Sequence, residues 1–374
     1  MPNPLTRLHD LGQSIWLDYI RRDMLVDGSQ ARLIRDDALA GQTSNPTIFQ
    51  QAIGKSDLYD EDIRAAASRE PRAVFEAIAV TDIRLAADLF RPLYDRTDGA
   101  DGFVSIEVDP DLAWDTDGSI EAARRLWRAV DRPNAMVKIP GTVEGLPAIR
   151  QCLAEGININ ITLLFSVDRY HQVMDAWFDA LEDRVRRGEP IDRLASVASF
   201  FVSRVDTKVD QRIDERLARA SDEDRERLES IAGRIGIDNA RLAYAAHERR
   251  FSDARFAALA ERGARPQRPL WASTSTKNPD YPDVYYVEAL IGPGTVNTLP
   301  PETLEAYRDH GEPAVRIRAD LDGAERRVAS LRELGLDFPA ILEELEKEGV
   351  EKFADSYHAL LETLEEKRKQ VQPA

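Results

Sequence analysis

The chain has 374 residues, of which 43% are hydrophobic and 31% charged, and its formal net charge of −17 would repel nucleic acid and anionic membranes. A phosphorylated small molecule is not excluded, because binding it requires only a local cluster of cations. Cys152 is the only cysteine, so we expect no disulfide within the chain. The first residues lack a signal-peptide pattern and no apolar run approaches membrane length, so we expect a cytoplasmic location.

Eight short runs, most of them apolar and each closed by a polar residue, alternate with helical patterns along the chain. The runs are Ser14–Asp18, Gly41–Asn45, Gly102–Glu107, Ala135–Lys138, Ile157–Thr162, Leu194–Ser199, Leu270–Ser273 and Gly294–Thr298. The second and the last are weak strands by composition. Strands that alternate with helices imply right-handed βαβ units and a parallel sheet. The sequence therefore predicts an α/β protein, a single (β/α)8 TIM barrel over residues 1–374.

Two helices between these strands are easily recognised. Ser166 is expected to cap a helix whose apolar residues recur every three or four positions and which ends before Gly188. Glu144–Glu155 is expected to form another helix, with Pro147 in its first turn and Gly156 at its C-terminal stop.

Two further segments should add helices to the barrel. Residues 206–262 are highly charged and helical in pattern, which predicts two or three helices inserted between the sixth and seventh strands. Residues 313–374 are again helical and are expected to pack on the barrel. An apolar stripe in this second segment should face the main body. Its members are Phe353, Tyr357, Leu360 and Leu364.

The candidate active-site residues are those that close the predicted strands, because a parallel α/β barrel carries its active site at the carboxyl ends of the strands. They are Asp18, Asn45, Glu107, Lys138, Asn160, Thr162 and Ser199. Alternation along a strand puts Asn160 and Thr162 on the same side. Carboxylates, a lysine, amides and hydroxyls at one mouth would form an acid–base site with a nucleophilic amine.

Lys138 is the most informative of these residues. A lysine at a strand end often only extends its amine to solvent. However, the chain has 8 lysines against 42 arginines, so a lysine in an apolar strand marks a position where arginine would not serve. Arginine keeps its proton, whereas a desolvated lysine can lose it, and only the neutral amine attacks a carbonyl.

Asp18 and Glu107 are candidates for the proton transfers that an imine mechanism requires. One base must remove a hydroxyl proton as a carbon–carbon bond breaks, and another group must relay protons while the imine forms and is hydrolysed. Taken alone, each carboxylate is equally well explained as a strand-end residue that caps the next helix. Lys138 nearby favours the catalytic interpretation.

Five segments resemble, in order and spacing, the signatures of the transaldolase family. They are Thr43–Phe49 (TSNPTIF), Val104–Pro110 (VSIEVDP), Val137–Thr142 (VKIPGT), Asn160–Ser166 (NITLLFS) and Ser199–Arg204 (SFFVSR). The resemblance extends from about residue 11 to residue 300, which is most of the chain. Five motifs in order are far more specific than any single lysine.

The resemblance implies a catalytic role for four residues. Lys138 would be the Schiff-base lysine and Asp18 the base at the cleaved bond. Glu107 and Thr162 would together position a catalytic water. The implied reaction needs no cofactor and no metal. It transfers a dihydroxyacetone unit from sedoheptulose 7-phosphate or fructose 6-phosphate to glyceraldehyde 3-phosphate or erythrose 4-phosphate, in the non-oxidative pentose phosphate pathway.

The resemblance also implies the residues that bind substrate. Asn45, Asn160 and Ser199 would hydrogen-bond the hydroxyls of the ketol unit, and Phe201 would line the site. Arg204 would hold the substrate phosphate with its planar fork of donors. The expected partners are therefore small sugar phosphates, with no nucleic acid and no membrane, and a homo-oligomer is left open.

The segment Trp271–Pro279 (WASTSTKNP) departs from the short-form pattern of the family, which has a serine, an aromatic residue and an arginine there. It resembles the long branch, with Lys277 in place of the second phosphate-binding arginine. Which of Ser273, Thr274 or Ser275 takes part is left open. Lys277 is equally well explained as a solvated loop cation.

Three alternatives compete with a transaldolase. A fructose-6-phosphate aldolase would carry glutamine at Glu107 and tyrosine at Phe201. A non-catalytic barrel that binds sugar phosphates would be indicated by substitution of the catalytic residues. In this chain the expected catalytic residues are all present. A metal-dependent aldolase would need a histidine-rich ligand set. The five histidines, however, lie outside every motif: His9, His171, His247, His310 and His358.

Overall fold

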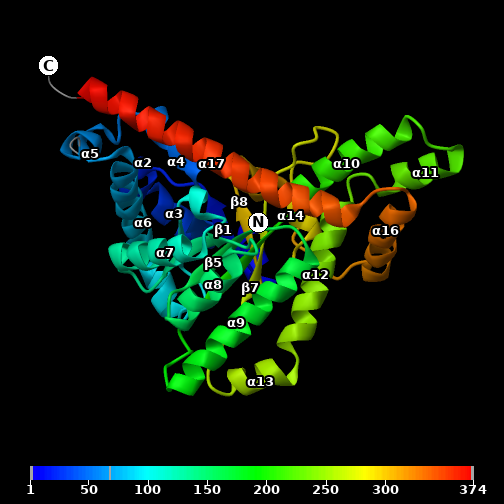
Figure 1. Cartoon of the computed structure of the whole chain (residues 1–374), viewed down its shortest axis with the longest axis horizontal. Helices are drawn as coiled ribbons and strands as arrows, with labels where there is room; N and C mark the ends of the chain where they lie inside the picture. The colour runs from blue at the N-terminus through cyan, green and yellow to red at the C-terminus, as the bar shows by residue number, and fades with distance from the viewer. Residues whose placement is uncertain (1–2, 67–68, 372–374) are drawn as a thin grey trace.

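The computed structural model describes residues 3–66 and 69–371. Its strands are β1 (Gln13–Asp18), β2 (Leu39–Thr43), β3 (Phe103–Glu107), β4 (Ala135–Pro140), β5 (Ile159–Leu164), β6 (Ser196–Phe201), β7 (Arg268–Ala272) and β8 (Thr295–Leu299). Each strand pairs in parallel with its neighbours in chain order, and β1 pairs with β8 (Figure 1). The sheet therefore closes, and the predicted (β/α)8 TIM barrel is confirmed.

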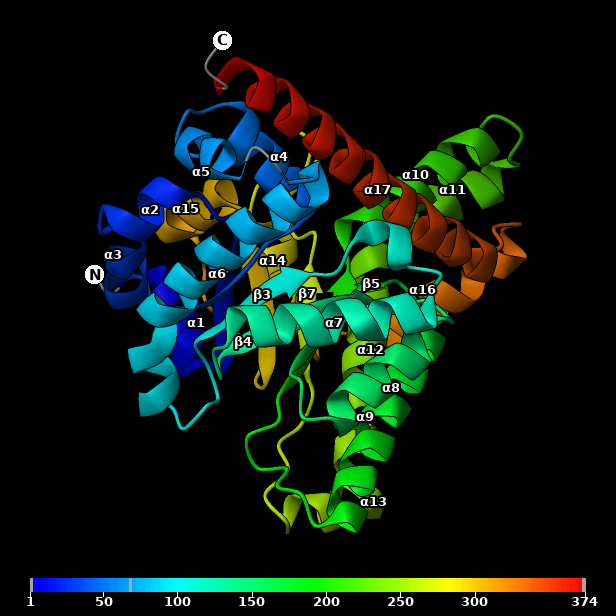
Figure 2. The ribbon, with the colours of Figure 1, turned by 60° about the vertical axis from the view of Figure 1, so that its left-hand side comes forward.

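The helices that lie between strands are α2 (Arg22–Val26), α3 (Ser29–Asp36), α4 (Pro46–Gly54), α5 (Asp60–Ala65), α6 (Pro71–Arg96), the 3-10 helix η1 (Pro110–Leu112), α7 (Thr116–Val130), α8 (Gly145–Ala154), α9 (Val167–Arg187), α10 (Ser203–Leu217), α11 (Asp222–Ile231), α12 (Ile235–Phe251), α13 (Ala254–Ala260) and α14 (Tyr285–Ala289). Helix α1 (Pro4–Asp10) precedes β1, and three helices follow β8: α15 (Pro301–His310), α16 (Leu321–Glu333) and α17 (Phe338–Val371). Figure 2 shows α7, α8 and α9 side by side against the barrel.

All eight predicted strands are present, with ends that shift by a few residues. The shifted strand end that matters most for the site is that of β2. The strand ends at Thr43, whereas the predicted run ends at Asn45. Asn45 is the N-cap of α4, and its side chain accepts a hydrogen bond of 3.0 Å from the backbone N–H of Ile48. The capping residue belongs to the helix because that side chain satisfies a free N–H of the first turn.

The two recognised helices form as predicted. Ser166 caps α9 by accepting a hydrogen bond of 3.0 Å from the backbone of Arg169, and Gly188 ends the helix at φ +73°. In α8, Pro147 lies in the first turn, and Gly156 follows the helix at φ +89°. Glycine adopts this left-handed conformation without the penalty that a Cβ imposes.

Residues 203–260 form four helices between β6 and β7, α10 to α13, where the sequence predicts two or three. Two of the extra breaks are made by capping side chains, since Ser221 caps α11 and Asp253 caps α13. Gly233, at φ +70°, separates α11 from α12. The hydrophobic periodicity continues across these short breaks, which is why pattern alone undercounts the helices.

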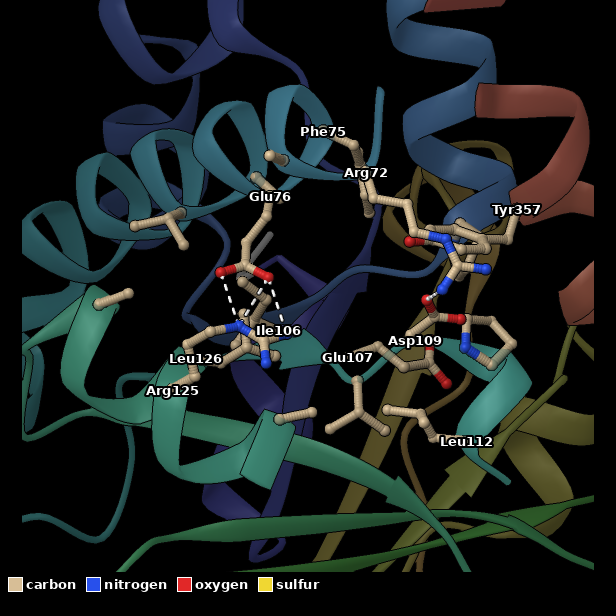
Figure 3. A pocket seen from close by; sticks show the side chains of 18 of the residues that line it. Arg72, Phe75, Glu76, Ile106, Glu107, Asp109, Leu112, Arg125, Leu126 and Tyr357 are labelled. Atoms are coloured by element: carbon tan, nitrogen blue, oxygen red, sulfur yellow. Dashed lines mark hydrogen bonds and ion pairs between the residues drawn. The ribbon is translucent and has the colours of Figure 1, made fainter. Parts of the chain in front are cut away.

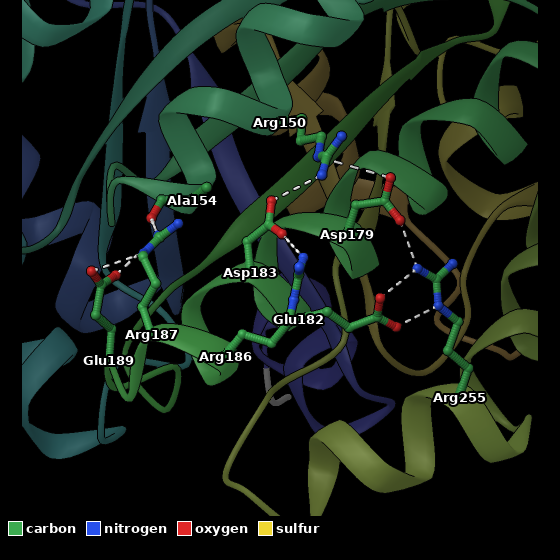
Figure 4. Close-up of polar contacts among 9 residues, drawn as sticks. All are labelled: Arg150, Ala154, Asp179, Glu182, Asp183, Arg186, Arg187, Glu189 and Arg255. Carbon is green, nitrogen blue, oxygen red and sulfur yellow. Dashed lines mark hydrogen bonds and ion pairs between the residues drawn. The ribbon is translucent and has the colours of Figure 1, made fainter.

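Arginines of the outer helices pair with carboxylates of neighbouring helices (Figure 4). Arg255 of α13 contacts Asp179 and Glu182 of α9, each at 2.7 Å. Arg150 of α8 contacts Asp183 of α9 at 2.9 Å. An exposed ion pair is worth at most about 1 kcal/mol, so these contacts orient the helices and add little stability.

The C-terminal helix α17 is 34 residues long and crosses the carboxyl end of the barrel (Figure 1). The predicted stripe of Phe353, Tyr357, Leu360 and Leu364 is buried against the body. Lys367 fixes one end by donating to the carbonyl of Ser56 at 2.6 Å. Within the described part of the chain, neither this helix nor another is long and apolar enough to span a bilayer.

We predict that Asp206→Asn makes the protein more stable at pH 8 than the wild type by about 1–3 kcal/mol. Burial raises the pKa of Asp206 to about 7, and Asp210 adds to this. A carboxyl with a raised pKa binds its proton more tightly in the folded chain. The free energy of unfolding therefore falls as the pH rises from about 4 to 7. Asparagine is neutral over this whole pH range, so the substitution removes the decrease in the free energy of unfolding that Asp206 causes.

The measurement is urea unfolding at pH 5 and pH 8. The matched control is Asp222→Asn, which removes an exposed carboxylate from α11. If Asp206→Asn and the wild type lose the same stability between the two pH values, Asp206 does not titrate as the structure indicates.

Candidate active site

The carboxyl ends of the strands open into a cavity of about 830 Å³ that lies beneath α17. Nine of the eleven predicted site residues line it: Asp18, Asn45, Lys138, Thr162, Ser199, Phe201, Arg204, Ser273 and Lys277. The other two, Glu107 and Asn160, are not among the residues that line the cavity. The cavity therefore brings together residues that are up to 259 positions apart, from Asp18 to Lys277.

Lys138 lies on β4 directly opposite Glu107 of β3 in the strand register. Its side chain is only 6% exposed. The amine donates to the backbone carbonyl of Ser44 at 3.0 Å and to Glu107 Oε2 at 3.2 Å. This arrangement fixes the amine at the floor of the cavity, where water is largely excluded.

Burial raises the pKa of both candidate acids. For Glu107 the effect of burial is opposed by Lys138, and for Asp18 it is opposed by Lys138 and then Arg204. A buried carboxyl that keeps its proton more readily is suited to giving and taking protons near neutral pH. Desolvation beside a specific cation is the usual environment of a general acid or base.

Asn160 and Thr162, which alternation puts on the same side of β5, have different surroundings. The side chain of Thr162 lines the cavity, and Leu163 follows at φ +59° where the pairing of β5 with β6 becomes irregular. Asn160 is 1% exposed. It donates to Ser105 Oγ at 3.0 Å and accepts from Ser199 Oγ at 2.7 Å. In this structure Asn160 thus supports Ser199 from below and does not line the cavity.

Two cations face the cavity at its outer end. Arg204 lies in the first turn of α10, with its guanidinium 5.1 Å from the centre of the Phe201 ring. Burial lowers the pKa of Arg204, and Asp18 opposes that effect. Among residues 3–66 and 69–371, no carboxylate forms an ion pair with Arg204 or Lys277. Such cations can bind an anion without first breaking a contact.

The hydroxyls after β7 differ in their surroundings. Ser273, at φ +56°, has its Oγ 2.9 Å from Ser203 Oγ. Thr274 is fully buried and donates to Asn297 Oδ1 at 2.8 Å. Ser275 lines the cavity and has no hydrogen bond to another described residue. Ser275 is therefore the most available hydroxyl of the three.

Two residues that contact the site were not identified from the sequence. The backbone of Ser44 holds the Lys138 amine. The ring of Phe353, on α17, has its centre 5.8 Å from Lys138 Nζ and 5.8 Å from Arg204 Cζ. The only sequence signal for Phe353 is its place in the apolar stripe, which predicts burial and not the site that it covers.

A second cavity of about 690 Å³ lies behind Glu107, between α6, α7, η1 and α17 (Figure 3). Two of its three arginines are paired: Arg125 contacts Glu76 at 2.9 Å, and Arg72 contacts Asp109 at 2.9 Å. Unlike the cavity above Lys138, it has no lysine among its described lining residues. The described residues include no group of three or more His, Cys, Asp or Glu side chains that could hold a metal ion.

Comparisons with known proteins agree with this geometry. The family described as Transaldolase/Fructose-6-phosphate aldolase matches residues 15–364. A transaldolase of Acidothermus cellulolyticus is 50% identical over 96% of this chain and 95% of its own length. A transaldolase of Thermobifida fusca is 48% identical over 97% of both chains, and one of Trichodesmium erythraeum is 43% identical over 99% of both. The chain belongs to the transaldolase/fructose-6-phosphate aldolase family.

Proposed function

We propose that the chain acts as a transaldolase that carries a three-carbon ketol unit on Lys138. The donors would be sedoheptulose 7-phosphate or fructose 6-phosphate, and the acceptors glyceraldehyde 3-phosphate or erythrose 4-phosphate, in the non-oxidative pentose phosphate pathway. The observation that carries the proposal is a buried lysine amine that contacts Glu107 and acts electrostatically on Asp18, in a cavity whose outer end has unpaired cations. Relatives that are 43–50% identical and named transaldolase support it.

The reaction begins when the neutral amine of Lys138 adds to the ketone carbon of the donor. Water leaves and an imine forms. Asp18 then accepts the proton of the hydroxyl on carbon 4 while the bond between carbons 3 and 4 breaks. The electron pair moves into the imine to give an enamine, and the first aldehyde departs.

The second aldehyde then replaces the first. The enamine attacks its carbonyl carbon, and Asp18 returns the proton to the new hydroxyl. Glu107 and Thr162 would hold the water that hydrolyses the resulting imine and regenerates the Lys138 amine. Glu107 is suited to this relay because its Oε2 lies 3.2 Å from the amine. It can take the ammonium proton before attack and return a proton when the imine is released.

The outer cations would bind the donor phosphate. Arg204 is the stronger candidate because its fork of donors matches two phosphate oxygens at once. Its stacking on Phe201 fixes the plane of that fork. Lys277 would add a second positive charge, and the hydroxyl of Ser275 a neutral donor.

Borohydride added with fructose 6-phosphate should inactivate the enzyme irreversibly and leave one modified peptide, which contains Lys138. An imine is reduced to a stable secondary amine, whereas a metal-bound enolate is not. The measurement is residual activity followed by peptide mass spectrometry. A label on another lysine, or inactivation by a chelator alone, would rule out this mechanism.

Glu107→Gln should lower kcat by about 10²- to 10⁴-fold with little change in KM, because a proton-relay group acts in the transition state. Arg204→Ala should instead raise KM by about 10- to 100-fold, since a phosphate contact of about 1.5–3 kcal/mol is made in both the ground and the transition state. Steady-state kinetics separate the two effects. Arg219→Ala, an exposed arginine after α10, is the control. Equal and small effects of both substitutions would contradict the assigned roles.

Phe201→Tyr should increase release of free dihydroxyacetone from fructose 6-phosphate relative to transfer onto erythrose 4-phosphate. After the first aldehyde leaves, the fate of the enamine depends on whether water or a second aldehyde arrives first. Phenylalanine offers no hydroxyl to place a water, whereas tyrosine adds one near the imine. Both rates are measured on one preparation, with Lys138→Arg as a blank. An unchanged ratio would mean that Phe201 only packs.

A further inference from the structure

The C-terminal helix brings a third cation to the phosphate end of the cavity. Lys352 of α17 lines the same cavity as Arg204 and Lys277. These three residues come from separate parts of the chain: α10, the loop after β7 and α17. The family match extends to residue 364, but the five motifs quoted for the resemblance end at Arg204 and none of them includes Lys352.

The position of Lys352 is fixed by contacts on both sides of it in α17. Before it, Glu344 and Glu348 contact Lys208 of α10 at 2.7 and 2.6 Å. After it, Phe353 is buried, and its ring centre lies 5.8 Å from Arg204 Cζ. The backbone that carries Lys352 is therefore held against α10 at the level of Arg204.

Lys352 has no carboxylate partner among the residues that the structure describes. Glu348 precedes it by four positions, the spacing at which glutamate and lysine commonly pair on a helix. Here Glu348 contacts Lys208 instead. Lys352 is exposed, and its pKa is lowered, first by Arg204 and then by desolvation and Lys277. The three cations therefore repel one another, an unfavourable arrangement that a bound dianion would reverse.

We propose that Lys352 is a third phosphate-binding residue, so that α17 completes the sugar-phosphate site. This inference rests on the proposed function and goes beyond it, because it assigns substrate binding to a helix outside the family motifs. A phosphate between Arg204 and Lys352 would link α10 to α17. It would thereby hold Phe353 over Lys138 while a phosphorylated donor or acceptor is bound.

The test compares Lys352→Met with Lys347→Met, which removes an exposed lysine of the same helix that does not line the cavity. Lys352→Met should raise KM for fructose 6-phosphate by about 2- to 5-fold and leave kcat within about 1.5-fold. It should also weaken binding of inorganic phosphate, measured by calorimetry, to a similar degree. Lys347→Met should match the wild type, and Lys352→Arg should restore most of the affinity.

A second measurement separates phosphate binding from a structural role of the helix. Dihydroxyacetone has no phosphate, so borohydride labelling of Lys138 with dihydroxyacetone should proceed at the wild-type rate in Lys352→Met. Slower labelling would mean that the substitution disturbs the site, which overturns the proposal. Unchanged phosphate affinity and KM would overturn it as well. A wild-type protein that binds phosphate without transferring the ketol unit would refute the proposed function and leave the role of Lys352 intact.

Discussion

The contact between Lys138 and Glu107 is the interaction on which the rest of the site depends. The register of β3 and β4 puts the two residues opposite each other, and both are buried. Removing one partner of a buried pair commonly costs about 3–5 kcal/mol, because the other charge is left without compensation. The pair also prepares the chemistry: burial raises the pKa of Glu107, so passing the ammonium proton to that carboxylate costs less than it would in water.

The charge of the cavity is opposite to that of the molecule. The chain carries a net charge of −17, and most of its outer arginines are engaged by carboxylates. Arg204, Lys277 and Lys352 have no such contact among residues 3–66 and 69–371. A cationic cavity in a surface that is otherwise acidic concentrates its field at the mouth, which favours a small anion and disfavours a polyanion. This explains how an acidic protein can act on sugar phosphates.

The barrel and the strand-end residues of the site follow from local pattern, whereas Phe201, Arg204 and Lys277 are implied only by the resemblance to the family. Apolar runs closed by polar residues locate the strands, and the scarcity of lysine singles out Lys138. Asn160 is predicted to hydrogen-bond the ketol unit, and alternation puts it on the side of Thr162, but alternation cannot reveal the hydrogen bonds that Asn160 makes to Ser105 and Ser199. The stripe that contains Phe353 predicts which face of α17 is buried, but not what lies beneath that face. Contacts between distant segments depend on the tertiary fold and leave no local signal.

The close approach of α17 to the barrel depends on one glycine. A Cβ added at Gly349 would lie 3.0 Å from Leu163 Cδ2, closer than side chains normally pack. Glycine inside a helix costs about 0.5–1 kcal/mol relative to alanine, so its presence here is offset by the contact that it permits. Leu163 is itself held at φ +59°, directly after Thr162. The irregular end of β5 thus contributes to the site twice: Thr162 lines the cavity, and Leu163 next to it packs against Gly349 of α17, the helix that carries Phe353 to within 5.8 Å of Lys138 Nζ.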